Sequence, residues 1–202
     1  MEKPFAPSAE RNKQAILEAL RDSLGQVHRV LEIGSGTGQH AVHIAQSLDH
    51  LEWQSSELEE RIEGVRAWTS EAALANLPAP IVIDVNSDDW RCPPVQAVFS
   101  ANTVHYMPWA SVAFLFRGVA KLLDNDGVFL LYGPFNYDGE YVSDGNRQLD
   151  IWLAQQNPEY AIRDIEKIIA VAGEHGFELR EDCPMPANNR LLIWRRSGSH
   201  KT

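Results

Sequence analysis

The sequence contains little cysteine, since only Cys92 and Cys183 occur among its 202 residues. The two lie far apart, each beside a proline, and neither belongs to a metal-ligand spacing. We therefore expect two free thiols, as in a reducing compartment, and no metal site. The start of the sequence has no apolar signal core, and no apolar run approaches the roughly 18 residues of a membrane span. These absences predict a cytoplasmic protein.

Basic residues are also scarce. Lysine and arginine number 18 against 28 acidic residues, which gives a formal net charge of -10. A nucleic-acid-binding protein needs a basic surface, and so does a protein that binds an anionic membrane, so the charge argues against both classes. No internal repeat or low-complexity tract is present. With 44% hydrophobic residues, the sequence predicts one domain over 1–202: an N-terminal arm and helix (1–27), a core (28–196) and a disordered tail (197–202).

The most informative stretch follows a short apolar run at Arg29–Ile33. Three glycines occur at alternate positions, Gly34, Gly36 and Gly38, and a helical pattern begins at about Gln39. A strand, a glycine-rich turn and a helix together bring a ligand close to bare backbone at a helix N-terminus. The spacing is E-x-G-x-G-x-G and not the dinucleotide pattern G-x-G-x-x-G. The carboxylate of Glu32 would repel a pyrophosphate but suits a cationic ammonium group.

Strand and helix patterns alternate along the chain. We expect strands at 29–33, 51–56, 81–83, 97–101, 128–132, 177–182 and 190–195, and helices at 8–24, 39–48, 62–77, 109–123, 146–156 and 164–175. Alternation predicts an α/β fold with a doubly wound, mainly parallel, seven-stranded, Rossmann-like sheet. The short connection 183–189 predicts that the last two strands pair antiparallel, with the last strand antiparallel in the sheet.

The glycine motif resembles motif I of the class I S-adenosylmethionine-dependent methyltransferases. The resemblance implies S-adenosyl-L-methionine as cofactor, with Glu32 near its methionine moiety. The alternative for the motif alone is a tight turn in another doubly wound protein. Because ligands bind beyond the C-terminal ends of such strands, the residues after each strand are candidates. The predicted cofactor-binding residues are Arg11, Asn12, Glu32, Gly34, Ser35, Gly36, Gly38, Glu57, Asp84, Val85 and Asn102.

Each residue after a strand also has a simpler interpretation. Glu57 can bind ribose hydroxyls, or it can be a solvated carboxylate at the start of the acidic run 57–60. Asp84 can reach an adenine amino group, or it can cap the turn after its strand. Asn102 can touch the cofactor, or it can be a turn residue.

The sequence also resembles the methyltransferase-like 26 family over nearly its whole length. The shared stretches are 8–13, 31–38, 132–139, 143–150, 157–164 and 185–189. The sequence departs from that family in having Glu57 where aspartate is expected, and Leu58 where proline is expected. The resemblance implies a role near the cofactor for Arg11 and Asn12, whose alternative is a solvated helix face.

The long loop 133–145 is rich in polar and aromatic residues, which argues for a functional loop or lid over the site. The predicted substrate-binding residues are Tyr132, Asn136, Tyr137, Arg147, Asn188 and Asn189. The two asparagines can instead form a plain turn. His105, with Tyr106 beside it, is the candidate catalytic group, because a neutral histidine can act as a general base. Its alternative is a structural histidine.

The leading function is methyl transfer to a small-molecule acceptor, by O- or N-methylation, with no nucleic-acid or membrane partner. A second hypothesis is a module that binds S-adenosylmethionine without turnover. A third is an NAD-dependent oxidoreductase, which Glu57 would suit but the glycine spacing and Glu32 disfavour. The acceptor and the oligomeric state are not evident from the sequence.

Overall fold

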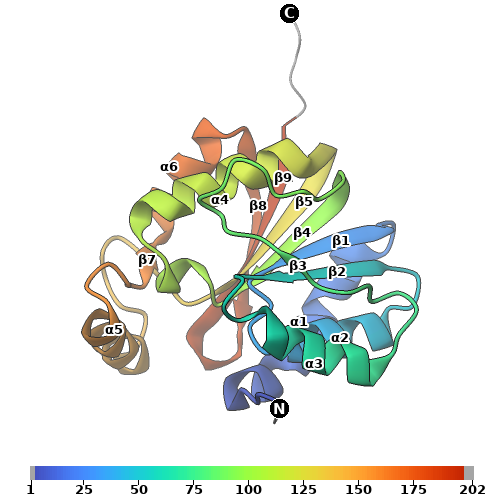
Figure 1. The fold of residues 1–202 in the computed structure, drawn as a ribbon. Coiled ribbons are helices and arrows are strands. Elements are labelled where there is room, and N and C mark those ends of the chain that lie inside the picture. Colours follow the sequence, from blue (N-terminus) through green and yellow to red (C-terminus); the bar gives the residue numbers. More distant parts are fainter. Residues whose placement is uncertain (1–2, 198–202) are drawn as a thin grey trace, which may run out of the picture. The chain divides into compact units, whose positions relative to one another are not determined.

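The structure is a computed structural model and describes residues 3–197 (Figure 1). Most of the predicted tail 197–202 therefore lies outside the described residues, as do the first two residues of the predicted arm. The chain divides into two compact units, Met1–Ser100 and Ala101–Thr202. Each unit is described by itself below.

The first unit follows the predicted alternation. Its elements are α1 (Pro7–Leu24), β1 (Arg29–Ile33), α2 (Gln39–Ser47), β2 (Glu52–Glu57), α3 (Ile62–Ala72), β3 (Ile81–Val82) and β4 (Val95–Ala101). Strand β1 pairs in parallel with β2 and with β4, and β2 pairs in parallel with β3. Val30–Ile33 are buried because a central parallel strand is covered on both faces. Helix α1 buries Ile16, Leu20 and Leu24, which recur every four residues on one helix face.

The strands of the second unit belong to two different sheets. Its elements are η1 (Val104–Tyr106), α4 (Trp109–Leu122), β5 (Leu123–Gly133), β6 (Phe135–Asn136), α5 (Asp144–Gln156), β7 (Arg163–Asp164), α6 (Ile165–Glu174), β8 (Phe177–Met185), η2 (Pro186–Asn188) and β9 (Asn189–Arg196). Strand β9 pairs antiparallel with both β5 and β8, which confirms the predicted terminal hairpin. Strands β6 and β7 form a separate parallel pair, which the sequence did not predict.

The predicted fold class is confirmed. The seven strands follow the order β3-β2-β1-β4-β5-β9-β8, mostly parallel, and the last strand is antiparallel. The direction of strand order reverses at β1 and β4. In open α/β sheets the crevice at such a reversal, beyond the C-terminal strand ends, is where ligands bind. The glycine loop leaves β1 at that end.

Several predicted boundaries are wrong. Helix α3 ends at Ala72 and not near Leu77, because Ala73 is left-handed and the Asn76 side chain donates to three backbone carbonyls. The strand predicted at 128–132 begins earlier, because β5 starts at Leu123 and includes Asp126, which keeps a positive φ of 64°. The predicted connection 183–189 is mostly strand, because β8 continues to Met185 before the short η2 turn.

Candidate functional site

The glycine loop is held in a left-handed backbone conformation at all three glycines. Gly34, Gly36 and Gly38 have φ values of 70°, 59° and 93°. Residues with a Cβ rarely adopt such values, so the local sequence requires glycine here. Gly38 and Gly36 have different roles. At Gly38 a Cβ would meet Trp68 Cβ at 3.1 Å and Val65 Cα at 3.3 Å, so this glycine lets α3 pack against the loop.

Gly36 differs because its missing side chain would point into open space. A Cβ built there has no heavy atom within 4 Å. The loop therefore presents bare backbone to a space that a Cβ would partly fill. This feature fits a ligand that lies directly on the backbone at the start of a helix. The residues present thus fit the predicted cofactor at this position.

Glu57 ends β2 beside the loop. Its side chain is buried, with an exposed fraction of 6% for the residue. One carboxylate oxygen accepts from the Gly36 amide at 2.7 Å, and the other accepts from the Leu58 amide at 2.9 Å. The solvated interpretation of Glu57 is therefore wrong. The carboxylate instead binds the loop at Gly36, the residue that faces open space.

Glu32 lies beneath the loop and is almost fully buried, with 1% exposed. Its Oε2 accepts from Ser35 Oγ at 2.8 Å and from Trp53 Nε1 at 3.1 Å. Burial raises the pKa of this carboxyl to about 7, and the nearby charge of Glu57 adds to the rise, while the two hydrogen bonds oppose it. Glu32 therefore braces Ser35 and the loop. The contact with a methionine moiety stays a prediction.

Arg11 and Asn12 on α1 have different surroundings. Arg11 is exposed, as the solvated-face interpretation expects. Asn12 is half-buried, and its Oδ1 lies 2.8 Å from His40 Nε2. Burial lowers the pKa of His40 to about 4, so this histidine is neutral near pH 7. Asn12 therefore joins α1 to α2, which begins directly after the glycine loop.

Asp84 and Val85 follow β3. Asp84 is exposed, and its Oδ1 accepts from the Asn86 amide and from Asn86 Nδ2, both at 2.9 Å. This is the turn-capping role that the sequence left open. Val85 is half-buried. Contact of either residue with an adenine ring stays a prediction.

In the second unit, His105 is buried on the short η1 helix, with 2% exposed. Its Nδ1 has no hydrogen-bond partner among the described residues. Burial lowers the pKa of His105 to about 4, and the charge of Arg163 contributes. A Cβ on Gly133 would lie 3.7 Å from His105 Nδ1 and 3.8 Å from Asn102 Oδ1. The structure thus groups His105 and Asn102 around the end of β5.

Asn102 itself forms a turn. Its φ is 56°, and its amide donates to the Tyr132 carbonyl at 2.8 Å. The turn interpretation therefore describes its backbone, while its side chain lies close to Gly133. Contact with the cofactor stays a prediction. Tyr106 packs on His105 with ring centroids 4.6 Å apart, and the residue is 39% exposed.

Arg163 is a residue that the sequence analysis missed as part of the site. Its Nε donates to the Val104 carbonyl at 3.2 Å, and its Nη2 donates to the carbonyls of Met107 at 2.5 Å and Glu159 at 2.8 Å. The guanidinium therefore fixes the turn that carries His105. The only sequence signal was its position in the shared stretch 157–164.

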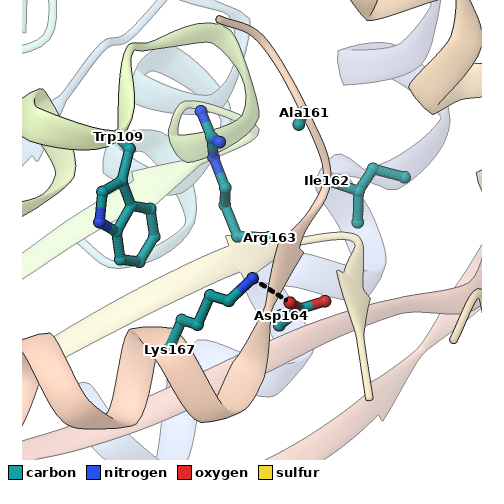
Figure 2. Close-up of a pocket in the computed structure, with 6 residues that line it drawn as sticks. All are labelled: Trp109, Ala161, Ile162, Arg163, Asp164 and Lys167. Carbon is teal, nitrogen blue, oxygen red and sulfur yellow. Dashed lines mark ion pairs between the residues drawn. The ribbon is translucent and has the colours of Figure 1, made fainter. Parts of the chain in front are cut away.

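A cavity of about 350 Å³ lies next to Arg163 (Figure 2). It is lined by Trp109, Ala161, Ile162, Arg163, Asp164 and Lys167. Lys167 Nζ pairs with Asp164 Oδ2 at 2.7 Å, as the dashed line in Figure 2 shows. None of the predicted site residues lines this cavity. Its volume falls in the range of small-molecule pockets.

Tyr137, a predicted substrate-binding residue, is engaged within the protein. Its hydroxyl donates to Asp182 Oδ2 at 2.7 Å, and Arg190 Nε donates to the other oxygen of Asp182 at 2.6 Å. Burial raises the pKa of Tyr137, and the bond to Asp182 adds to this effect. The hydroxyl therefore ties the loop to β8. Direct contact with a substrate stays a prediction.

The other predicted substrate residues differ in exposure. Tyr132 and Asn136 are buried, and Asn136 Oδ1 has no hydrogen-bond partner among the described residues. Arg147 is exposed and lies over the Tyr141 ring, 5.6 Å from its centroid. Asn188 is exposed with a φ of 57°, and Asn189 Nδ2 donates to the carbonyls of Pro186 and Ala187. Asn188 and Asn189 therefore form a turn, which was the alternative to a substrate-binding role.

Within residues 3–197, no three histidine, cysteine, aspartate or glutamate side chains are grouped as metal ligands would be. Cys92 and Cys183 are both free thiols. Among the same residues, no helix combines the length and the apolar character needed to cross a bilayer.

One protein family has a sequence profile that matches residues 3–196, and its description is "Protein of unknown function (DUF938)". The chain belongs to the DUF938 family. This match covers both units and almost all of the described residues.

Several solved structures of similar fold are described as methyltransferases. An O-methyltransferase family protein from Burkholderia thailandensis superposes with a TM-score of 0.82 at 13% identity, covering 95% of this chain and 58% of that one. A putative O-methyltransferase from Nostoc punctiforme has a TM-score of 0.81 at 14% identity, covering 94% and 57%. Human N-acetylserotonin methyltransferase, in complex with S-adenosylmethionine, has a TM-score of 0.80 at 13% identity, covering 95% and 53%.

The chain thus spans little more than half the length of each of these proteins. At such low identity the likeness establishes the fold. It is the Rossmann-like class I methyltransferase fold that the sequence predicted.

Proposed function

We propose that this protein is an S-adenosylmethionine-dependent methyltransferase with a small-molecule acceptor, methylated on oxygen or nitrogen. The observation that carries the proposal is the glycine loop at the end of β1. Gly36 faces open space there, and the buried Glu57 carboxylate lies against it. The strand order reverses at this edge of the sheet, where ligands bind in open α/β folds.

The residues of the first unit offer a consistent set of contacts for the donor. An ionised carboxylate has about four lone-pair sites, and Glu57 uses one for the Gly36 amide and one for the Leu58 amide. The sites that remain can accept from the two hydroxyls of a ribose. The glycine backbone would hold the rest of the cofactor, and Asp84 and Val85 would lie towards the adenine. Arg11 and Asn12 complete the proposed set in this unit, and Asn102 of the second unit stays a predicted contact.

Bound S-adenosylmethionine supplies an electrophilic methyl group. The tasks of the protein are then to position the acceptor, exclude water and accept a proton where the nucleophile carries one. His105 suits the last task, because its low pKa keeps the ring neutral and its Nδ1 has no hydrogen-bond partner among the described residues. Arg163 would keep the His105 turn in place.

On the acceptor side we propose Asn136, with Tyr132 and Arg147, as the contacts. Tyr137, Asn188 and Asn189 would then shape the site through the internal bonds described above. The net charge of -10 supports a small-molecule acceptor over nucleic acid or an anionic membrane. The resemblance to the methyltransferase-like 26 family belongs to this proposal, as does a cytoplasmic location.

Two other functions compete with this one. The first is a module that binds S-adenosylmethionine without turnover. The second is an NAD-dependent oxidoreductase, but the buried Glu32 below the loop and the G-x-G-x-G spacing disfavour a pyrophosphate there. The direct test is to incubate the protein with methyl-labelled S-adenosylmethionine and a panel of small phenols, carboxylates and amines. Labelled product supports the methyltransferase. Binding without transfer to any acceptor supports the binding module.

Replacement of Glu57 by alanine should weaken the binding of S-adenosylhomocysteine by on the order of 1.5–3 kcal/mol, the range for hydrogen bonds to a charged group. The change also releases the Gly36 amide, which acts in the same direction. Isothermal calorimetry measures the effect. The matched control is Glu60→Ala in the same acidic run, where the side chain is exposed and affinity should not change. Equal affinities for the two variants would contradict the ribose assignment.

Replacement of His105 by alanine should lower turnover by on the order of 10²–10⁴-fold, the usual contribution of a general base. Because the pKa of His105 is about 4, wild-type turnover should not depend on this group above about pH 5 and should fall as the pH drops towards 4. The affinity for S-adenosylhomocysteine should be retained. If His105 is only structural, His105→Ala should instead lower thermal stability and leave the fall of turnover at low pH in place.

A further inference from the structure

The segment Lys3–Ala6, here called the strap, precedes α1 and lies across α2 and α3. The Ala6 amide donates to Gln39 Oε1 at 2.6 Å, and Trp68 Nε1 donates to the Pro4 carbonyl at 2.6 Å. Lys3 Nζ lies 3.9 Å from the centroid of the Trp68 ring and pairs with Glu71. The strap is thus attached to both helices that pack beside the glycine loop.

Gly64 on α3 places the strap next to the loop. A Cβ on Gly64 would lie 2.8 Å from Pro4 Cγ and 4.0 Å from the Gly36 carbonyl oxygen. The Pro4 ring and the Gly36 carbonyl therefore approach the same point on α3. Gln39 supports this arrangement from the other side, because its Oε1 accepts from Thr37 Oγ1 in the loop as well as from Ala6. The strap consequently lies close to Gly36, the residue that faces open space.

We propose that the strap forms a wall of the donor site and that Gly64 is the positioning residue that lets it lie there. This inference rests on the proposed function. An ordered wall beside Gly36 would limit the access of water to the cofactor and add contact surface to it. Because coupling between two binding events is reciprocal, a bound donor should in turn stabilise the docked strap.

The strap has the character of a segment that docks and releases. It is held by a few polar bonds, by the contact of Lys3 with the Trp68 ring and by the approach of Pro4 to Gly64, while Pro4 and Phe5 remain exposed, Phe5 by 58%. Segments with little buried apolar surface open at low free-energy cost. The strap would thus release and dock readily, and the docked form would be the one that holds the donor.

Gly64→Ala tests the proposal. The new Cβ cannot coexist with Pro4 in its present place, because 2.8 Å is shorter than real Cβ contacts. Alanine is the better helix former, so α3 should be retained. We expect the affinity for S-adenosylhomocysteine to fall by about 5- to 150-fold, the usual range for coupled sites. Amide exchange at Ala6 should become faster in the free protein, since the strap loses its seat.

The matched control is Gly173→Ala in α6, where a Cβ meets no atom within 4 Å. Its affinity and its Ala6 exchange should match those of the wild type. If Gly64→Ala releases the strap yet binds S-adenosylhomocysteine as tightly as the control, the strap is not a wall of the donor site. If the strap stays protected in Gly64→Ala, Gly64 does not position it. If the wild type itself binds no S-adenosylhomocysteine, the proposed function fails and this inference with it.

Discussion

Gly36→Ala is expected to reduce the affinity for S-adenosylhomocysteine by at least about 100-fold, or roughly 2.7 kcal/mol. The reason is local: the Cβ would occupy the open space into which the Gly36 backbone faces, where the cofactor is proposed to lie. Gly36→Val should act in the same direction and more strongly. Calorimetry on protein whose circular dichroism matches the wild type measures the effect.

The difficulty with any substitution at Gly36 is its φ of 59°, which strains residues with a Cβ. Gly139→Ala is a control for that strain. Gly139 has a φ of 77°, and a Cβ there also meets no atom within 4 Å, but it lies in the second unit, in the turn between Tyr137 and Glu140. Gly139→Ala should lose a similar amount of stability and no affinity. Equal affinities for folded Gly36→Ala and Gly139→Ala would contradict the proposed donor position.

Glu32→Gln is expected to change how stability depends on pH. The pKa of Glu32 is raised from 4.5 to about 7 in the folded protein, so the folded state holds this proton more tightly than the unfolded state does. The contribution of Glu32 is fully present below the unfolded pKa and is lost as the pH rises through 7. A glutamine side chain does not titrate in this pH range, so the variant does not lose this stability as the pH rises. Between pH 4.5 and pH 8, the variant should therefore gain about 3 kcal/mol relative to the wild type, at 1.36 kcal/mol per pKa unit.

The measurement is urea unfolding of both proteins at several pH values between 4.5 and 8. The comparison uses the change in their difference, because the glutamine amide also alters the bonds to Ser35 and Trp53 by an amount that does not depend on pH. Glu60→Gln, at an exposed position, should show no such change. A difference that stays constant with pH would mean that Glu32 ionises normally and is not buried as described. The same variant should bind S-adenosylhomocysteine more weakly if Glu32 attracts the cofactor's ammonium group.

The sequence predicted the fold well because its signals were local and repeated. The glycine motif marked the end of β1, and alternating apolar runs marked the parallel strands around it. The errors arose where tertiary contacts override local patterns. Helix α3 ends early because Asn76 satisfies three backbone carbonyls of the neighbouring chain segment. The parallel pair β6–β7 joins residues far apart in sequence, and two-residue strands have no periodicity to detect.

The sequence predicted part of the loop described above, and its role as a cofactor site stays a proposal. The motif gave Gly36 and Glu32, and the position after a strand gave Glu57. The sequence could not show that Glu57 bonds to the Gly36 amide, which removes its solvated alternative. It also missed Gly64 and Arg163. The role of Gly64 depends on the approach of Pro4, 60 positions earlier, and that of Arg163 depends on carbonyls 56 and 59 positions away. Tyr137 was chosen as a loop aromatic, but its hydroxyl partner lies on β8.

The central claim is that the glycine loop with Glu57 binds the methyl donor. The most direct test is a calorimetric titration of the wild-type protein with S-adenosylhomocysteine and, separately, with NAD. The account predicts saturable binding of one S-adenosylhomocysteine per chain and no binding of NAD. Binding of NAD, or no binding of S-adenosylhomocysteine to folded protein, would contradict it.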